Sequence, residues 1–224
     1  MRVLYIASIG KSSSVNGGYE FVSNSFVSLL EKLKGMGVAD YTIVNTNQKS
    51  DLVKVSETYD VGIILCHYKS FDNLNFKTNI SRLRSHCKKF YFHWFWETNS
   101  LPSHVDWMFK ESLFTGFIAS SDFNVSLIND KIKQLNSKQD AYKVYPLIED
   151  IKDKIDIEKK KKEDKFTVLY IGQYTKRKGL EDSIIAFTHA FADKDDCQLY
   201  LKYHRLSQIE YNEKEMIQRT VGMN

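Results

Sequence analysis

The stretch FTVLYIGQYTKRKGLEDSIIAFTHAF, from Phe166 to Phe191, decides the fold class of this 224-residue chain. It begins with a short apolar run of strand-forming residues, which Gly172 ends. After Gly179 the spacing becomes helical, and one helix face collects Leu180, Ile184, Phe187, Thr188 and Phe191. The stretch therefore predicts a buried strand, a cationic turn and a helix whose N-terminus faces that turn.

The cationic turn has the chemistry of a diphosphate site. Free backbone N–H groups at a helix start attract anions, and Lys178 beside them adds a full charge. The alternative interpretation is an ordinary strand–helix unit with a solvated basic loop, because glycine and lysine are common in such loops. The pattern alone leaves both interpretations open.

The N-terminus repeats the order of strand, glycine loop and helix. Residues 2–8 predict a buried strand, and a loop of small residues leads to Gly17-Gly18 and a helix over residues 21–33. Paired glycines either let the backbone approach a ligand or simply make a tight turn. No G-x-G-x-x-G fingerprint occurs, which argues against a nicotinamide enzyme.

Strands alternate with helices along the rest of the first part of the chain. We expect strands at 41–45, 61–66, 89–94, 116–120 and 143–147, and helices at 73–85, 104–113 and 122–135. This alternation predicts an α/β fold with a doubly wound, Rossmann-like parallel sheet and helices on both faces. Ligands of such sheets sit at the carboxyl ends of the strands, where we expect the segment from Ser8 to Gly18, His67, His93 and Ser120-Ser121.

The predicted domains are an N-terminal Rossmann-like domain over 1–149, a charged linker over 150–165 and a partial second Rossmann-like unit over 166–224. The linker is nearly neutral and is interpreted as a solvated tether. A parallel sheet of two strands cannot bury both of its faces. We therefore expect the second unit to expose apolar residues, namely Leu169, Ile171, Leu199 and Leu201.

Composition excludes several function classes. The chain is 42% hydrophobic and 13% aromatic, which suffices for a packed core, and its net charge of +4 is too small to demand nucleic acid. Cys66, Cys87 and Cys197 are far apart and no CxxC or HxxxH pair occurs, so we expect a reducing compartment and no metal site. No apolar run is long enough to span a bilayer, and we predict a cytoplasmic protein.

The segment HWFWETNSLP, which begins at His93, is the most unusual in composition. Two tryptophans, a histidine and a glutamate directly follow a predicted strand. An aromatic pair is more often part of a core than of a ligand site, and a lone histidine at a strand end is more often hydrogen-bonded than catalytic. Ser121 is interpreted as the N-cap of the helix that follows.

In their order and spacing, three stretches resemble the GT-B glycosyltransferases, and in detail family four of the retaining enzymes. Gly17-Gly18 is similar to the N-terminal glycine loop of that family. The segment with Trp96-Glu97-Thr98 and Leu101-Pro102 is similar to its W-E-x…L-P segment. Residues 172–179 resemble its G-R-x-x-x-x-K-G loop, which holds the donor diphosphate.

The resemblance implies roles for individual residues. Lys178 corresponds to the phosphate lysine of the family and Gly179 to the glycine after it, while Gln173 stands where an arginine is usual and Arg177 could compensate for that charge. His93 matches the catalytic histidine at the domain cleft, and Gly17 and Gly18 match the loop that faces the donor phosphates. Glu97 is a candidate acceptor contact.

The implied activity is transfer of a sugar from a nucleotide-diphosphate sugar to an acceptor hydroxyl with retention, without a metal or other cofactor. The acceptor is a carbohydrate, a lipid or a protein, and peripheral membrane contact stays open. No E-x(7)-E element of the family occurs in this sequence. We therefore expect the chain alone to be a poor transferase that needs an oligomer or a missing partner segment. The alternatives are a non-catalytic truncated remnant, half of a split enzyme, or an unrelated nucleotide- or phosphate-binding module.

Overall fold

The computed structural model describes residues 1–9, 17–46, 55–96, 98–111, 113–145, 165–173 and 176–204. The chain divides into two compact units, residues 1–150 and 151–224. Most of the predicted linker lies outside the described residues, so each unit is considered by itself.

The described part of the first unit contains one sheet of six strands in the order β2-β1-β3-β4-β5-β6. All neighbouring strands run parallel. The strands are β1 (Arg2–Ala7), β2 (Asp40–Asn45), β3 (Tyr59–Leu65), β4 (Cys87–Trp94), β5 (Gly116–Ala119) and β6 (Asp140–Lys143). The fold is α/β and Rossmann-like, as the alternation of strands and helices predicted.

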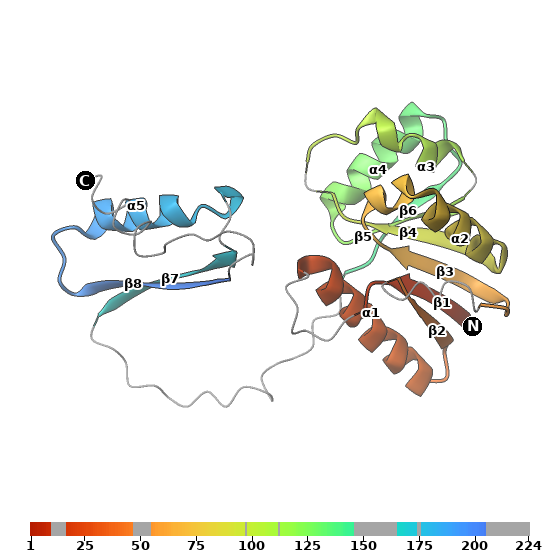
Figure 1. Ribbon diagram of the computed structural model, residues 1–224, viewed down its shortest axis with the longest axis horizontal. Helices are drawn as coiled ribbons and strands as arrows, with labels where there is room; N and C mark the ends of the chain where they lie inside the picture. Colours follow the sequence, from red (N-terminus) through yellow and green to blue (C-terminus); the bar gives the residue numbers. More distant parts are fainter. Residues whose placement is uncertain are drawn as a thin grey trace. The chain divides into compact units, whose positions relative to one another are not determined.

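Helices cover both faces of this sheet (Figure 1). On one face α1 (Gly17–Gly35) places Phe26 against Tyr5 and Leu65. The other face is covered by α2 (Leu74–Ser85), α3 (Trp107–Lys110) and α4 (Asp122–Gln134), which pack on an aromatic layer that includes Phe92, Trp94 and Phe117. Alternate residues of each buried strand therefore serve two separate cores.

Local sequence signals fix several helix ends. Ser121 caps α4, since its hydroxyl accepts the backbone N–H of Asn124 at 3.2 Å. Asn73 caps α2 in the same way, through the backbone N–H of Phe76 at 3.1 Å. The predicted N-cap role of Ser121 is thus confirmed.

Two predicted elements were wrong. The last strand of the sheet is Asp140–Lys143 instead of 143–147, and its pairing with β5 defines it, because its own residues are mostly polar. The predicted helix over 104–113 is instead a 3-10 turn, η3 (Ser103–Val105), followed by the four-residue α3. Glu111 ends α3 with an extended backbone, ψ 139°, and its carboxylate binds Lys77 at 3.0 Å.

In the described part of the second unit, β7 (Phe166–Gln173) pairs in parallel with β8 (Cys197–His204). The helix α5 (Leu180–Phe191) covers one face, where Leu180 and Ile184 contact Tyr170, Leu199 and Leu201. The opposite face is open: Leu169, Ile171 and Tyr200 are 59%, 66% and 49% exposed. Leu169 and Ile171 are therefore exposed as expected, whereas Leu199 and Leu201 are half-buried beneath α5.

None of the helices in the described ranges combines the length and the apolar character that a membrane span requires.

Candidate functional site

The strand order of the first unit reverses at β1. The chain passes from β1 to β2 on one side and then to β3 on the other side of β1. In open α/β sheets, ligands bind outside the carboxyl ends of the strands at such a reversal. Ser8 follows β1 and His67 follows β3 at this edge, so the topology places a candidate site here.

Gly17 and Gly18 form the first residues of α1. Helix starts carry backbone N–H groups without an intrahelical partner, and α1 is long enough for its dipole to favour an anion there. The preceding residues 10–16 lie outside the described part of the chain. The prediction that Gly17 and Gly18 face donor phosphates therefore remains a prediction.

His93 lies at the carboxyl end of β4, but its side chain is fully buried. Its ring contacts those of Phe26 in α1 and Phe95, each at 4.8 Å between centroids. Burial lowers the pKa of His93 to about 4, so the imidazole is neutral at physiological pH. In this arrangement the ring can orient neighbouring groups, but it offers no exposed face to a substrate.

Unpartnered polar atoms accompany His93 beneath α1. The hydroxyls of Tyr5 and Ser23 and Nδ1 of His93 are buried and have no hydrogen-bond partner among the described residues. The Ser23 hydroxyl lies next to that of Tyr5 without completing a hydrogen bond, and burial raises the pKa of Tyr5. Buried polar groups of this kind are commonly satisfied by internal water.

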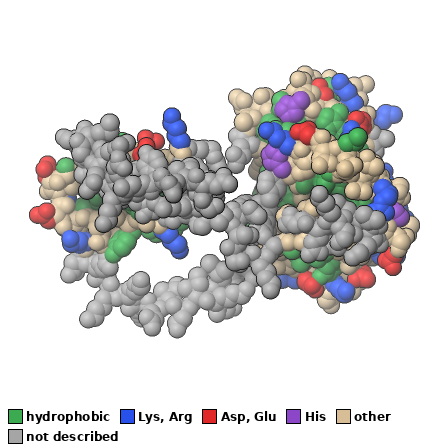
Figure 2. All heavy atoms as spheres, viewed as in Figure 1, with side chains coloured by type: hydrophobic (Ala, Val, Ile, Leu, Met, Phe, Trp, Pro, Cys, Tyr) green, Lys and Arg blue, Asp and Glu red, His purple; other side chains and the backbone are tan. Residues whose placement is uncertain are grey.

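Four aromatic rings meet at the same edge of the sheet, and we call them the aromatic shelf. Tyr68 is central, with ring centroids of His67, Trp96 and His104 at 4.7, 5.5 and 5.4 Å. His67 and His104 are exposed, whereas Tyr68 and Trp96 are half-buried. Figure 2 shows histidine side chains close to basic side chains on the visible face of this unit.

Sequence reasoning placed His67 at this edge but missed the shelf. Its members come from the segments after β3 and after β4 and from η3. The aromatic residues directly after two neighbouring strands could have indicated the shelf, because parallel strands bring their carboxyl ends together.

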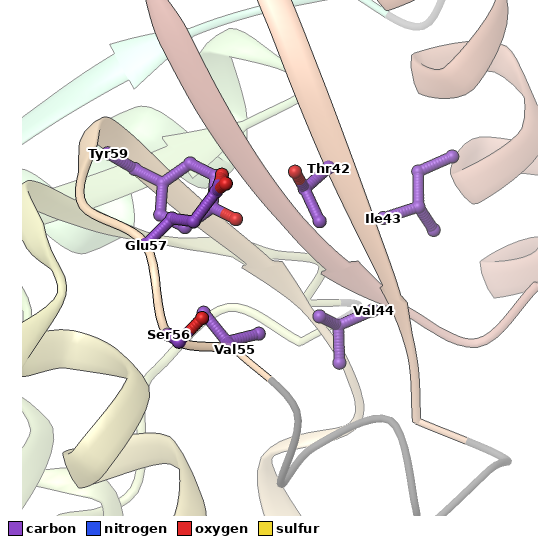
Figure 3. A pocket seen from close by; sticks show the side chains of 7 residues that line it. All are labelled: Thr42, Ile43, Val44, Val55, Ser56, Glu57 and Tyr59. Atoms are coloured by element: carbon purple, nitrogen blue, oxygen red, sulfur yellow. The ribbon is translucent and has the colours of Figure 1, made fainter.

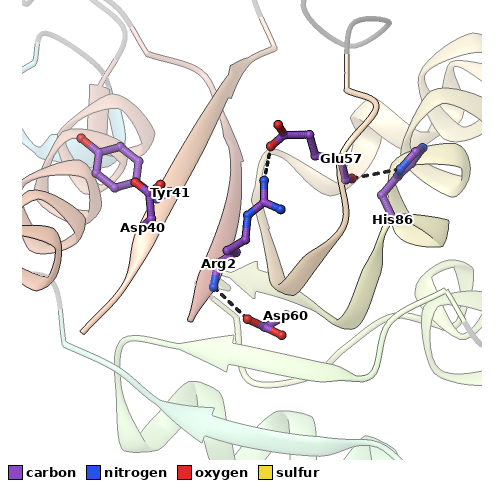
Figure 4. Close-up of polar contacts among 6 residues, drawn as sticks. All are labelled: Arg2, Asp40, Tyr41, Glu57, Asp60 and His86. Carbon is purple, nitrogen blue, oxygen red and sulfur yellow. Dashed lines mark hydrogen bonds and ion pairs between the residues drawn. The ribbon is translucent and has the colours of Figure 1, made fainter. Parts of the chain in front are cut away.

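The opposite edge of the sheet carries paired charges instead (Figure 4). Arg2 binds the carboxylate of Glu57 through its guanidinium and that of Asp60 through its backbone N–H at 2.8 Å. Lys88 binds Asp60 at 2.7 Å and, with the Arg2 N–H, lowers the pKa of that carboxyl. These charges satisfy one another, which favours the carboxyl edge as the functional one.

A hollow of about 450 Å³ lies between β2 and the segment that leads into β3. Figure 3 shows Thr42 and Val44 projecting from β2 toward Val55, while Ile43 lies on the other side of the strand. Its other lining residues are Ser56, Glu57 and Tyr59. The only charged residue of this lining, Glu57, is paired with Arg2, and no residue predicted for the site takes part.

In the second unit, the predicted cationic turn leads into the start of α5. A 3-10 turn, η5 (Lys176–Lys178), precedes Gly179, which has a left-handed backbone with φ +65°. A residue with a Cβ is strained in that conformation, so glycine is the residue that suits it. Gly179 is the N-cap and offers no capping side chain, and Lys178 beside it is exposed.

The turn is held by hydrogen bonds to its own backbone. The hydroxyl of Tyr170 donates to the carbonyl of Lys178 at 3.0 Å, and that of Ser183 donates to the carbonyl of Gly179 at 2.8 Å. Asp182 in the first turn opposes an anion, because its carboxylate lies near Gly179. Lys178 and the backbone N–H groups at the start of α5 can bind a phosphate, although the carboxylate of Asp182 repels it.

Two further predicted residues are placed only in part, and a third is not placed. Gln173 ends β7 and Arg177 lies in η5, but their side chains lie outside the described residues. Glu97 lies outside them entirely. The structure brings His93 and the aromatic shelf to one edge of the first unit, and Lys178 and Gly179 together in the second.

Comparison with models of known protein families finds no match, and no curated protein is similar in sequence.

Proposed function

We propose that this chain is a GT-B glycosyltransferase of the retaining type, or part of one, and that it takes its sugar from a nucleotide-diphosphate donor. The observation that carries the proposal is the unit β7–η5–Gly179–α5. There a left-handed glycine and an exposed lysine stand at the start of a helix of 12 residues. The Rossmann-like first unit, which would carry the acceptor, supports it further.

In the proposed reaction the leaving group is a nucleoside diphosphate, so negative charge develops on the phosphate oxygens. Lys178 and the N–H groups after Gly179 would stabilise that charge, with Gln173 and Arg177 as further donors. Removal of one preorganised hydrogen-bond donor of this kind lowers the catalytic rate by roughly 10²–10³-fold. We propose a separate phosphate contact for the α1 start at Gly17 and Gly18, and no step requires a metal.

The burial of His93 alters the role proposed for it. A fully buried, neutral imidazole acts as a positioning residue, which fixes the carboxyl ends of β4 and β5 through Ser120. Glu97 is proposed to contact the acceptor. We propose a cytoplasmic location and a second chain or a second copy over the open face of β7 and β8.

A thermal-shift experiment with UDP, GDP, ADP and their sugars tests the donor site. A ligand at 100 times its Kd stabilises the protein by about 2.7 kcal/mol. We expect one nucleoside diphosphate to raise the Tm of the chain, and Lys178→Ala to abolish the shift. The matched control is Lys194→Ala, which removes an exposed lysine beyond the other end of α5 and should leave the shift unchanged. No shift with any nucleotide would contradict the proposal.

A second candidate is a binding protein that holds a nucleotide diphosphate without transferring a sugar. The burial of His93 favours it, because this removes the proposed catalytic side chain from substrate. The two functions separate when the chain, with bound nucleotide sugar, is incubated with acceptors. Release of the diphosphate at an acceptor-dependent rate supports the transferase, and binding without release supports the binding protein.

A further inference from the structure

We propose that the aromatic shelf of His67, Tyr68, Trp96 and His104 is a carbohydrate-binding subsite that stacks a pyranose ring. As an acceptor subsite it rests on the proposed function, whereas the binding of a sugar ring can be tested without it. Nothing in the roles already given to Lys178, Gly179 or His93 uses these four rings.

The shelf is open on one side and supported on the other. Tyr68 and Trp96 pack on the aromatic core beneath them, and Trp94 meets Trp96 edge to face at 5.8 Å. His67 and His104, by contrast, are exposed. The arrangement therefore combines a fixed base with accessible ring surface.

Hydrogen bonds hold the Trp96 indole in place. Its Nε1–H donates to the hydroxyl of Thr98 at 2.6 Å and to the carbonyl of Ser100 at 2.8 Å. Its backbone N–H donates to the side-chain oxygen of Asn124 at 2.8 Å. Since the polar edge of the indole is occupied, what it can offer to a ligand is its ring surface, already ordered before binding.

The chemistry of the shelf fits a sugar ring. Aromatic faces carry negative electrostatic potential, which attracts the polarised C–H bonds on the apolar side of a pyranose. The rings of His67, Trp96 and His104 are tilted by 31°, 56° and 34° to Tyr68, so they surround it instead of forming a flat stack. The imidazole of His104 adds nitrogen donors and acceptors, which suit the hydroxyls at the rim of a sugar, whereas Nδ1 of His67 already accepts the backbone N–H of Lys69 at 3.3 Å.

The position of the shelf fits the same ligand. It lies beyond the carboxyl ends of β3 and β4, and β3 borders the point where the strand order reverses. A sugar stacked on the exposed rings of the shelf would therefore sit at the edge where ligands of this fold bind. The charged residues of the opposite edge are already paired with one another.

Saturation-transfer difference NMR on the full chain tests this proposal. The ligands are the methyl glycosides of glucose, galactose, mannose and N-acetylglucosamine, each at millimolar concentration. We expect saturation of the ring C–H protons of at least one glycoside. Tyr68→Ala should lower its affinity about fivefold, as the loss of about 1 kcal/mol of ring stacking implies.

Two further variants keep the result interpretable. His104→Ala removes an exposed ring and leaves the core intact, so it should also weaken the saturation. Tyr142→Ala, at an exposed tyrosine on β6 outside the shelf, is the matched control and should leave the saturation unchanged. Equal saturation in all variants, or none with any glycoside, would overturn the proposal.

The proposals for the donor site and for the aromatic shelf can be tested independently. Lys178→Ala should leave the sugar saturation unchanged, and Tyr68→Ala should leave the thermal shift by nucleoside diphosphates unchanged. If UMP displaces the glycoside and Tyr68→Ala abolishes UMP binding, the shelf is a nucleobase platform and the proposal is wrong.

Discussion

The Nε2 atom of His93 lies 3.1 Å from the hydroxyl oxygen of Ser120, and this bond joins the carboxyl ends of β4 and β5 beneath α1. The other ring nitrogen, Nδ1, has no partner among the described residues. A protonated imidazole would need two acceptors in a site lined by Phe26 and Phe95. The neutral ring is therefore the form that the fold stabilises.

The stability of the first unit should fall at acidic pH because of His93. Its folded pKa is about 4, below the unfolded value of 6.5. Above pH 6.5 neither state is protonated, but between pH 6.5 and 4 only the unfolded state takes up the proton. The free energy of unfolding should therefore fall by up to about 3 kcal/mol over this window. Urea denaturation at a series of pH values measures it.

The control for this prediction is His93→Gln, which cannot titrate. We expect this variant to be less stable at pH 7 and to show a flatter pH dependence between pH 6.5 and 4. If both proteins lose stability with the same pH slope, the proton uptake belongs to other groups.

Gly62→Ala should destabilise the first unit. A Cβ at Gly62 in β3 would collide with the ring of Phe90 and would lie 2.6 Å from Sγ of Cys87. Overpacking of a dense core costs about 1–3 kcal/mol. The midpoint of urea unfolding should shift to lower concentration, with the two-state slope unchanged.

Gly35→Ala is the matched control for Gly62→Ala. Gly35 ends α1, and a Cβ there would have no neighbour within 4 Å. Because alanine is the better helix former, this variant should be as stable as the parent chain or up to about 1 kcal/mol more stable. Equal destabilisation by both changes would show that Gly62 is not tightly enclosed.

Asp182→Asn should strengthen the binding of a nucleoside diphosphate while it weakens α5. The carboxylate lies in the first turn, where it favours the helix by about 0.3–1 kcal/mol and repels a bound anion. We expect affinity to rise by about two- to fivefold as measured by isothermal titration calorimetry. Asp193→Asn, just beyond the end of α5, should leave the affinity unchanged. Weaker binding to Asp182→Asn would place the phosphate elsewhere.

Much of the fold could be predicted from apolar spacing. The run that ends at Gly172 and the helical face from Leu180 to Phe191 correspond to β7 and α5. The prediction that this strand is buried was wrong, because α5 covers only one face of the described two-stranded sheet and Leu169 and Ile171 are exposed. The bounds of β6 were not predicted correctly. This strand is an exposed edge strand whose bounds are set by its pairing with β5, and polar residues such as Asp140 give no apolar pattern from which that pairing could be predicted.

The candidate site was less predictable. The position of His93 at a strand end followed from the strand pattern, but its burial depends on Phe26, which is far away in the sequence. The aromatic shelf depends in the same way on rings from separate segments that meet around Tyr68. Spacing along one segment cannot reveal such contacts.

The most direct test of the central claim is an NMR titration of the ¹⁵N-labelled chain with the nucleoside diphosphate selected by thermal shift. Binding at the start of α5 predicts that the largest amide shift changes lie at Lys178, Gly179 and Leu180, and that Lys178→Ala suppresses them. Saturation with the nucleotide that leaves these amides unmoved, or that shifts the same distant amides in both proteins, would contradict the account.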